Sequence, residues 1–160
     1  MARKSGIFAG IIALILAFIE IIPLYPPNNI FLNCRIFSYE NVNYYYWGYI
    51  EKNSSFTSIT LPSPENLVAL SVWMIILIVG ILSIMGSTTK ANLINSSKIY
   101  KINIVFLTFL LFIFGYIVVI LVIPDYINIF YTLGEGYYLT ILSLILNIIA
   151  LKKIPKKGEE

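Results

Sequence analysis

Four long apolar stretches, separated by shorter polar segments, dominate the pattern of this 160-residue chain. They cover approximately residues 6–25, 67–85, 102–123 and 137–151, and none of them contains Lys or Arg. About 20 apolar residues cross about 30 Å of hydrocarbon as a helix, so the first three are long enough. The fourth needs its Tyr-rich shoulder or a locally thinned bilayer. The pattern predicts an all-α membrane protein, a four-helix transmembrane bundle forming a single domain over residues 1–160.

The loop between the first two spans, residues 26–66, has a different pattern. Its stretches 30–39, 42–50 and 56–61 are rich in Ile, Phe, Tyr, Val, Thr and Trp, which favour strands. Turn-prone residues separate these stretches. We therefore expect three short antiparallel strands, which make this loop a small β-rich cap.

The distribution of positive charge predicts the orientation of the chain. Nine of the 11 basic residues lie before the first span, between spans two and three, or after span four. Only Arg35 and Lys52 lie in the long loop. Cytoplasmic loops carry the excess of Lys and Arg, so we expect both termini in the cytoplasm and the β-rich loop outside the plasma membrane. In that orientation Asn53, in Asn-Ser-Ser, is a candidate glycosylation site.

A cleaved signal peptide is the alternative interpretation of the first span. Basic residues followed by an apolar core fit the first two regions of such a peptide. Ile21, Ile22 and Pro23 stand where a cleavage site requires small residues, which favours a retained anchor.

Composition narrows the chemistry. The chain is 59% hydrophobic and 12% charged, with a mean hydropathy of +0.86, which is typical of a membrane protein. It contains no His, which excludes His-ligated metals and Ser-His or Cys-His nucleophilic centres. Cys34 is the only cysteine, so an intrachain disulfide is impossible. We expect no enzymatic activity, no cofactor, no bound metal and no nucleic-acid partner. A membrane enzyme using carboxylates of the outer loops remains an alternative.

Small residues form a stripe along the first span. Gly6, Gly10, Ala13 and Ala17 are spaced by 4, 3 and 4 residues, which places them on one helical face. Such small-xxx-small steps let helix backbones approach closely, so this stripe is predicted to be a helix-packing seam. Glu20 extends the same stripe and is the acidic residue expected within a span. Three roles are open for it: a structural role near the outer interface, a place in a proton or ion pathway, or contact with a partner.

A weaker polar stripe follows the fourth span. Thr140, Ser143 and Asn147 occupy positions i, i+3 and i+7, so one helical face can form hydrogen bonds to another helix. Ser83 in span two and Thr108 in span three offer matching polar positions. We expect these groups to fix the register of the helices.

Aromatic residues are concentrated in the long outer loop. Two roles are open: packing a small sheet against the headgroup region, or forming a recognition surface. The candidate interaction surface comprises Tyr44, Tyr45, Tyr46, Trp47 and Tyr49.

The segment Trp47-Gly48-Tyr49, in a β-rich loop between spans one and two, resembles the layout of claudins and, more loosely, of tetraspanins. The resemblance covers topology only, because claudins carry Gly-Leu-Trp and two cysteines in that loop whereas this chain has the lone Cys34. No functional residue carries across. The sequence predicts a non-enzymatic scaffold, accessory subunit or surface-interaction protein. Its expected partners are the lipid bilayer and either other membrane subunits or further copies of itself.

Overall fold

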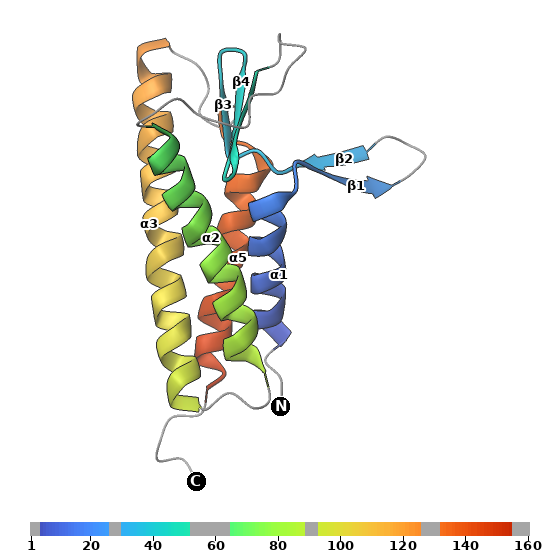
Figure 1. The fold of residues 1–160 in the computed structure, drawn as a ribbon, viewed down its shortest axis with the longest axis vertical. Helices are drawn as coiled ribbons and strands as arrows, with labels where there is room; N and C mark the ends of the chain where they lie inside the picture. Colours follow the sequence, from blue (N-terminus) through green and yellow to red (C-terminus); the bar gives the residue numbers. More distant parts are fainter. Residues whose placement is uncertain (1–3, 26–29, 52–64, 89–92, 126–131, 155–160) are drawn as a thin grey trace.

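The computed structural model describes residues 4–25, 30–51, 65–88, 93–125 and 132–154. This part of the chain is mostly helical, with four helices and a small β region (Figure 1). The helices are α1 (Lys4–Phe18), α2 (Glu65–Ser87), α3 (Leu93–Asp125) and α5 (Glu135–Lys152). Helices α2, α3 and α5 contain apolar segments long enough to cross a membrane.

Helix α1 is shorter than the sequence predicts. It ends at Phe18, with the N–H of Ile19 donating a last bond to the Ile15 carbonyl at 2.8 Å, and residues 21–25 form a strand instead. The prediction of a helix to residue 25 is therefore wrong. Pro23 explains the difference, because its ring would clash with the carbonyl of Ile19 in a helix and disfavours helical geometry at Ile22.

The other three helices contain the predicted spans and extend beyond them. Helix α3 differs most, because it begins at Leu93 rather than near residue 102. Its first two turns include Ser96 and Tyr100, which are completely buried. Their burial explains why this polar segment is part of the packed helix rather than of the loop.

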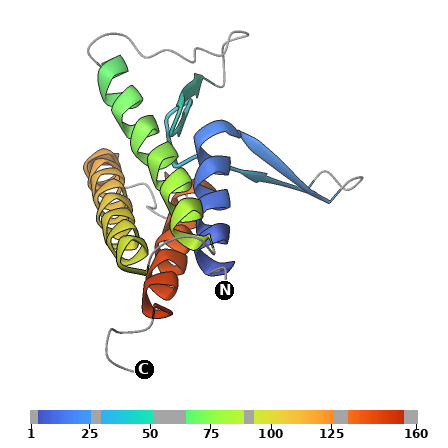
Figure 2. The same ribbon diagram turned by 60° about the horizontal axis from the view of Figure 1, so that its bottom comes forward.

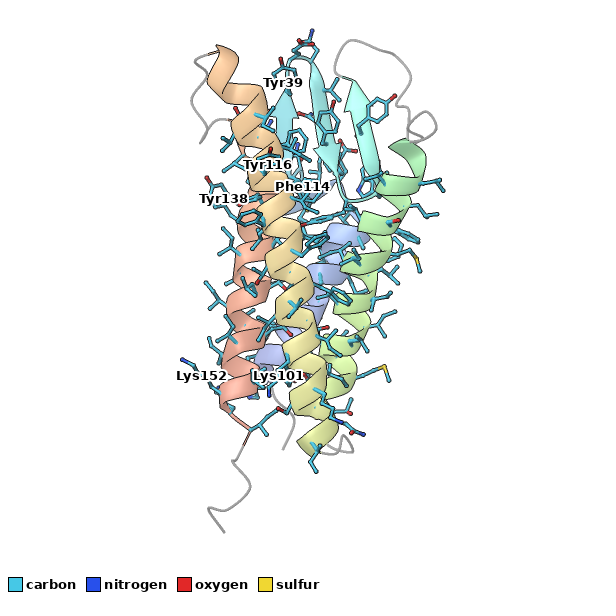
Figure 3. The ribbon with its side chains drawn as sticks, turned by 90° about the vertical axis from the view of Figure 1, so that its left-hand side faces the viewer. Tyr39, Lys101, Phe114, Tyr116, Tyr138 and Lys152 are labelled. Carbon is cyan, nitrogen blue, oxygen red and sulfur yellow. The ribbon has the colours of Figure 1, made fainter. Side chains whose placement is uncertain are left out.

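The helices pack side by side in a ring, as Figures 1 and 2 show. Helix α1 contacts α2 and α5, and α3 contacts the same two helices from the other side. Between them lies an apolar core, which includes Leu16 of α1, Val79 of α2 and Leu110 of α3. Figure 3 shows Lys101 and Lys152 near one end of the helices and Tyr39 near the other.

The β region consists of a hairpin and a separate three-stranded sheet. Strands β1 (Ile21–Tyr25) and β2 (Ile30–Asn33) pair antiparallel and project sideways from the end of α1 (Figures 1 and 2). Strands β3 (Phe37–Tyr39), β4 (Val42–Tyr45) and β5 (Gly48–Glu51) form the antiparallel sheet in the order β3-β4-β5. The predicted strand over residues 30–39 is thus divided between the hairpin and the sheet.

A turn at Tyr46 and Trp47 divides the predicted strand over residues 42–50. Tyr45 pairs with Gly48 across this turn, and Gly48 has a φ of 150°. Only glycine adopts this backbone conformation readily, so Gly48 permits the tight reversal. The third predicted strand, over residues 56–61, lies outside the described residues.

The start of α5 is held against the segment that joins the hairpin to the sheet. The N–H of Gly134 donates to the Ile36 carbonyl at 2.8 Å, and the N–H of Gly136 donates to the Arg35 carbonyl at 2.7 Å. A Cβ built on either glycine would overlap a backbone carbonyl oxygen of Cys34 or Arg35. Both glycines are therefore required by close packing, and they position the sheet above the helices.

Candidate functional site

A cluster of uncharged polar side chains lies inside the helix ring, in the half nearer Lys101 and Lys152, which we call the Lys-rich end. At its centre Ser83 of α2 donates to Asn147 Oδ1 of α5 at 2.9 Å and accepts from Asn103 Nδ2 of α3 at 2.8 Å. All three residues are completely buried. These bonds link three helices through one serine hydroxyl. We call Ser83, Ser87, Tyr100, Asn103, Ser143 and Asn147 the polar network.

Further hydrogen bonds extend the polar network to α1 and to the next turn of α2. Ser143 Oγ donates to the Ala9 carbonyl of α1 at 3.1 Å, and Asn147 Nδ2 donates to the Ser143 carbonyl at 2.9 Å. One turn further toward the Lys-rich end, Ser87 Oγ donates to the Ser83 carbonyl at 2.6 Å. The single Ser87 hydroxyl proton is thereby used, so Tyr100 donates to Ser87 across their 2.6 Å contact.

The chemistry of the network is that of hydroxyls and amides. Each buried polar group that finds a partner avoids a desolvation cost of about 1–3 kcal/mol, which makes such networks strong determinants of helix register. Asn103 Oδ1 forms no hydrogen bond within the described part of the chain. The network contains no carboxylate, amine or imidazole, so it can hold the helices in register but supplies no charged acid or base of its own.

The small residues of the first span lie against α2. Gly6, Gly10, Ala13 and Ala17 are all buried. A Cβ built on Gly10 would lie 2.7 Å from the backbone oxygen of Gly80, so the two helices are in near-backbone contact there. Near the C-terminal end of α1, Trp73 Nε1 of α2 donates to the Ala17 carbonyl at 2.9 Å.

Thr140, the remaining polar residue predicted on the fourth span, is not part of the polar network and makes a different contact. Its Oγ1 donates to the Gly136 carbonyl at 2.8 Å and accepts from Tyr46 Oη at 2.7 Å. The ring of Tyr46 packs edge-on against Phe114 of α3, with ring centroids 5.6 Å apart. Burial raises the pKa of Tyr46 above its usual value, so its hydroxyl stays protonated as a donor. This contact fixes the sheet to both α3 and α5.

The predicted aromatic surface is therefore divided between interior and exterior. Tyr45 and Tyr46 are buried, which removes both from the expected interaction surface. Trp47 stacks on Tyr45 with ring centroids 4.7 Å apart, and Tyr44 stacks on Phe37 at 4.4 Å. Tyr44, Trp47 and Tyr49 are only partly exposed. The aromatic residues of this loop chiefly pack the sheet together and onto the helices.

Glu20 and Thr108 lie away from the polar network. Glu20 is half-buried in the bend between α1 and β1, with its backbone carbonyl accepting the N–H of Cys34 at 2.7 Å. Its expected place within the first helix is wrong, because α1 ends at Phe18. The candidate glycosylation site Asn53 lies outside the described residues. Thr108 is exposed on α3, and Asn103 provides the polar contact expected from it.

No protein-family model, curated protein or solved structure matches this chain. The resemblance to the claudin layout therefore rests on the Trp47-Gly48-Tyr49 segment and the expected topology alone.

In the described segments, no three carboxylate or thiol groups gather closely enough to hold a metal ion. Arg35 and Glu135 approach to 3.8 Å beside the glycine contact at the start of α5. Burial raises the pKa of Cys34 to about 11, with a smaller contribution from the charge of Glu135. Cys34 is thus a packed thiol with little thiolate character near neutral pH.

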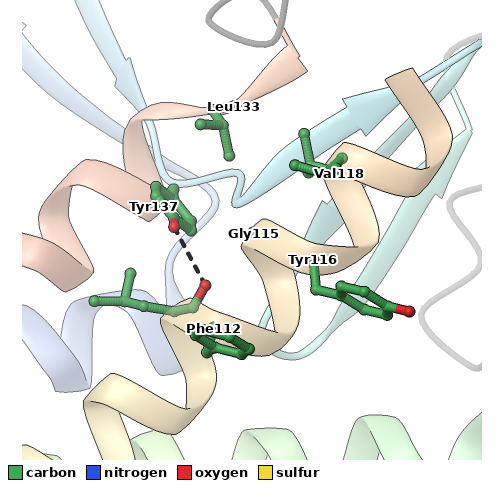
Figure 4. Close-up of a pocket in the computed structure, with 8 residues that line it drawn as sticks. Phe112, Gly115, Tyr116, Val118, Leu133 and Tyr137 are labelled. Atoms are coloured by element: carbon green, nitrogen blue, oxygen red, sulfur yellow. Dashed lines mark hydrogen bonds between the residues drawn. The ribbon is translucent and has the colours of Figure 1, made fainter. Parts of the chain in front are cut away.

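An open apolar groove of about 380 Å³ lies between α3 and α5 (Figure 4). Gly115 leaves the groove open on α3, and Tyr137 borders it from α5 with its hydroxyl donating to the Leu111 carbonyl at 3.2 Å. Its other lining residues are Phe112, Tyr116, Val118, Val119 and Leu133. The groove has no charged lining residue, so it offers shape and apolar contact rather than chemistry.

Sequence reasoning missed three members of the polar network. Ser87, Tyr100 and Asn103 were not among the predicted site residues, although all are buried. A pattern was present: Ser96, Tyr100 and Asn103 follow i, i+4 and i+7 and so share one face of α3. The polar residues before residue 102 made this segment resemble a loop, which hid the stripe.

Proposed function

We propose that this protein is a four-span integral protein of the plasma membrane, with both termini in the cytoplasm, that acts as a non-enzymatic scaffold, accessory subunit or surface-interaction protein. The observation that carries the proposal is the polar network. Its groups bond to one another and to backbone carbonyls across all four helices. Such bonds hold helices in register without supplying a reactive group.

Exposed apolar side chains support the membrane location. They occur on all four helices, among them Phe8 of α1, Met74 of α2, Phe112 of α3 and Ile145 of α5, with Phe112 77% exposed. A soluble domain rarely exposes so continuous an apolar surface. Lipid tails are the natural solvent for it.

The two ends of this apolar surface support the span and the orientation. On α3, Lys101 and Tyr116 are both exposed and are separated by 15 residues, or about 22 Å of helix. On the antiparallel α5, Lys152 and Tyr138 are 14 residues apart, or about 21 Å. Tyr favours the membrane interface, and long Lys side chains reach from the apolar region to water. The two helices therefore indicate an apolar layer of the same thickness, with Lys at one boundary and Tyr at the other.

Transport through Glu20 is the first rival. The position of Glu20 outside α1 and the neutral character of the network favour the scaffold, because neither supplies a chain of titratable groups through the helices. Partners are expected to be other membrane subunits or further copies of this chain.

The test combines transport with assembly. In proteoliposomes we expect no pH-driven proton or ion flux from the wild type, from Glu20→Gln, or from the control Glu40→Gln in the exposed β3–β4 turn. Flux from the wild type that survives in Glu40→Gln but disappears in Glu20→Gln would establish the rival. Extracted from its own membrane in mild detergent, the protein should migrate as a complex larger than its 18.2 kDa monomer. Migration as the bare monomer would contradict the subunit role.

A further inference from the structure

We infer that the β1–β2 hairpin is a membrane-interface element that lies in the outer headgroup–acyl boundary of the bilayer beside α1. The inference rests on the proposed membrane location and goes beyond it, because it assigns a lipid contact to a segment outside the helices. The hairpin begins directly after the end of α1 and projects away from the helices and the other sheet in both views (Figures 1 and 2).

The sequence of the hairpin is apolar and uncharged. Strand β1 is Ile-Ile-Pro-Leu-Tyr and strand β2 is Ile-Phe-Leu-Asn. No charged residue occurs between Glu20 and Arg35. An isolated two-stranded hairpin is marginal in water, and an exposed apolar strand edge there invites aggregation. Some apolar environment must therefore cover this hairpin.

The apolar surface of α1 continues into β1. Phe18 is 61% exposed, and Ile19 and Ile21 are also exposed. These three residues continue the exposed apolar surface of α1 onto the first residue of the hairpin. Glu20, which is half-buried, is the one polar residue between them. The continuity favours lipid as the occupant over a separate protein partner.

The length of α1 determines the level of the hairpin. Its 15 residues span about 22 Å, which is less than the roughly 30 Å of a hydrocarbon core. Figure 1 shows α3 continuing well past the level at which α1 ends. The chain therefore turns sideways where it approaches the outer boundary of the slab, and residues that would have completed a helix run along that boundary.

Backbone hydrogen bonding determines the depth. Strands β1 and β2 pair only with each other among the described segments, so each presents one unpaired edge. Unpaired N–H and C=O groups are excluded from the hydrocarbon core, but water and headgroups satisfy them at the interface. Pro23 in β1 is compatible with such an edge, because it has no N–H to leave unpaired. Interfacial amphipathic helices lie about 5–10 Å into the boundary, and we expect the hairpin to lie at a similar depth.

Spin labels attached to single introduced cysteines test the inference. The sites are Leu24→Cys and Phe31→Cys on the hairpin, Phe112→Cys on the exposed middle of α3, and Asn41→Cys in the exposed β3–β4 turn. Buried Cys34 is the only native cysteine, so the wild type is the labelling blank. Collision of each label with oxygen and with a water-soluble nickel chelate is measured in phosphatidylcholine vesicles.

We expect the hairpin labels to favour oxygen over nickel less strongly than the label at Phe112, and more strongly than the label at Asn41. Hairpin labels that match Asn41 would place the hairpin in water and overturn the inference. Labels immobilised and protected from both reagents would indicate a protein occupant and also overturn it.

A label at Phe112 that behaves like the one at Asn41 would instead refute membrane insertion, so the two failures are distinguishable. Each variant must unfold at the wild-type detergent concentration, and Tyr25→Cys on the same hairpin replaces any hairpin variant that does not.

Discussion

Replacing Gly10 by alanine adds one methyl group at the closest approach between α1 and α2. A Cβ at this position would lie 2.6 Å from Ile84 Cγ1 and 2.7 Å from the backbone oxygen of Gly80. The isoleucine side chain can rotate away, but the backbone oxygen moves only with its helix. The substitution must therefore separate α1 from α2 or bend one of them.

Two effects of opposite sign determine the magnitude. Alanine favours a helix interior over glycine by about 1 kcal/mol. Overpacking a well-packed contact costs typically about 1–3 kcal/mol, and a backbone obstacle favours the upper part of that range. We expect Gly10→Ala to lower the free energy of unfolding by about 1–2 kcal/mol, which is about tenfold in the unfolding equilibrium. Gly10→Leu should cost more, because its larger side chain meets the same obstacle.

Gly115 provides the matched control on another apolar helix. A Cβ there meets only Tyr137 Oη, at 3.1 Å, at the far end of a flexible side chain that is held by one long hydrogen bond beside an open groove. Gly115→Ala should therefore unfold at or above the wild-type detergent concentration. The assay is unfolding by dodecyl sulfate in mixed micelles, followed by circular dichroism. If Gly10→Ala proved as stable as Gly115→Ala, the near-backbone contact between α1 and α2 would be refuted.

Three further predictions follow from the network, the thiol and the charge distribution. Asn147→Leu should lower the free energy of unfolding by about 1–2 kcal/mol, because Ser83 and Asn103 lose an acceptor. The control Thr108→Val, at an exposed position, should change it by less than about 0.5 kcal/mol. Equal unfolding midpoints in dodecyl sulfate for the two variants would contradict the polar network. Maleimide should react with native Cys34 only as the pH approaches its pKa of about 11, and rapid labelling at pH 7 would show that the thiol is accessible. An impermeant thiol reagent on intact cells should label Asn41→Cys but not Lys98→Cys, both exposed positions, and the reverse pattern would invert the orientation.

Helix existence was predictable from the sequence because long apolar runs have few alternatives. Runs over residues 67–85, 102–123 and 137–151 all lie within helices. Helical spacing also identified buried faces without a structure, since Gly10 and Ala13 of α1 and Asn147 of α5 are buried. These inferences needed only a local period, which the sequence contains in full.

The end of α1 was not predictable from hydrophobicity, because a short apolar segment such as residues 21–25 fits a strand as well as the last turns of a helix. Pro23 was the available indication, and it was outweighed by the length of the run. Burial of Tyr46 was missed for a related reason: it occupies a turn, and turn residues are usually exposed. Its position depends on Thr140 and Phe114, which are distant in sequence. Such pairings are tertiary and have no local signature.

The interior of the helix ring changes character along its length, and this division bears on the proposed role. Toward the Lys-rich end Ser83, Asn103 and Asn147 are joined by hydrogen bonds, whereas Leu110 and Phe114 lie toward the sheet. Apolar contacts alone orient membrane helices weakly, because lipid tails are equally apolar, so the polar network supplies the register at one end.

At the other end the register comes from the sheet. The hydrogen bonds of Gly134 and Gly136 to the backbone of residues 35 and 36, and that of Tyr46 to Thr140, hold it against α5. Helices α3 and α5 are thus constrained at both ends of the packed interior. A carrier that opens alternately to the two sides of a membrane requires two arrangements of its helices, whereas a scaffold requires one. Constraint at both ends favours a single arrangement, and so favours the scaffold over an alternating carrier.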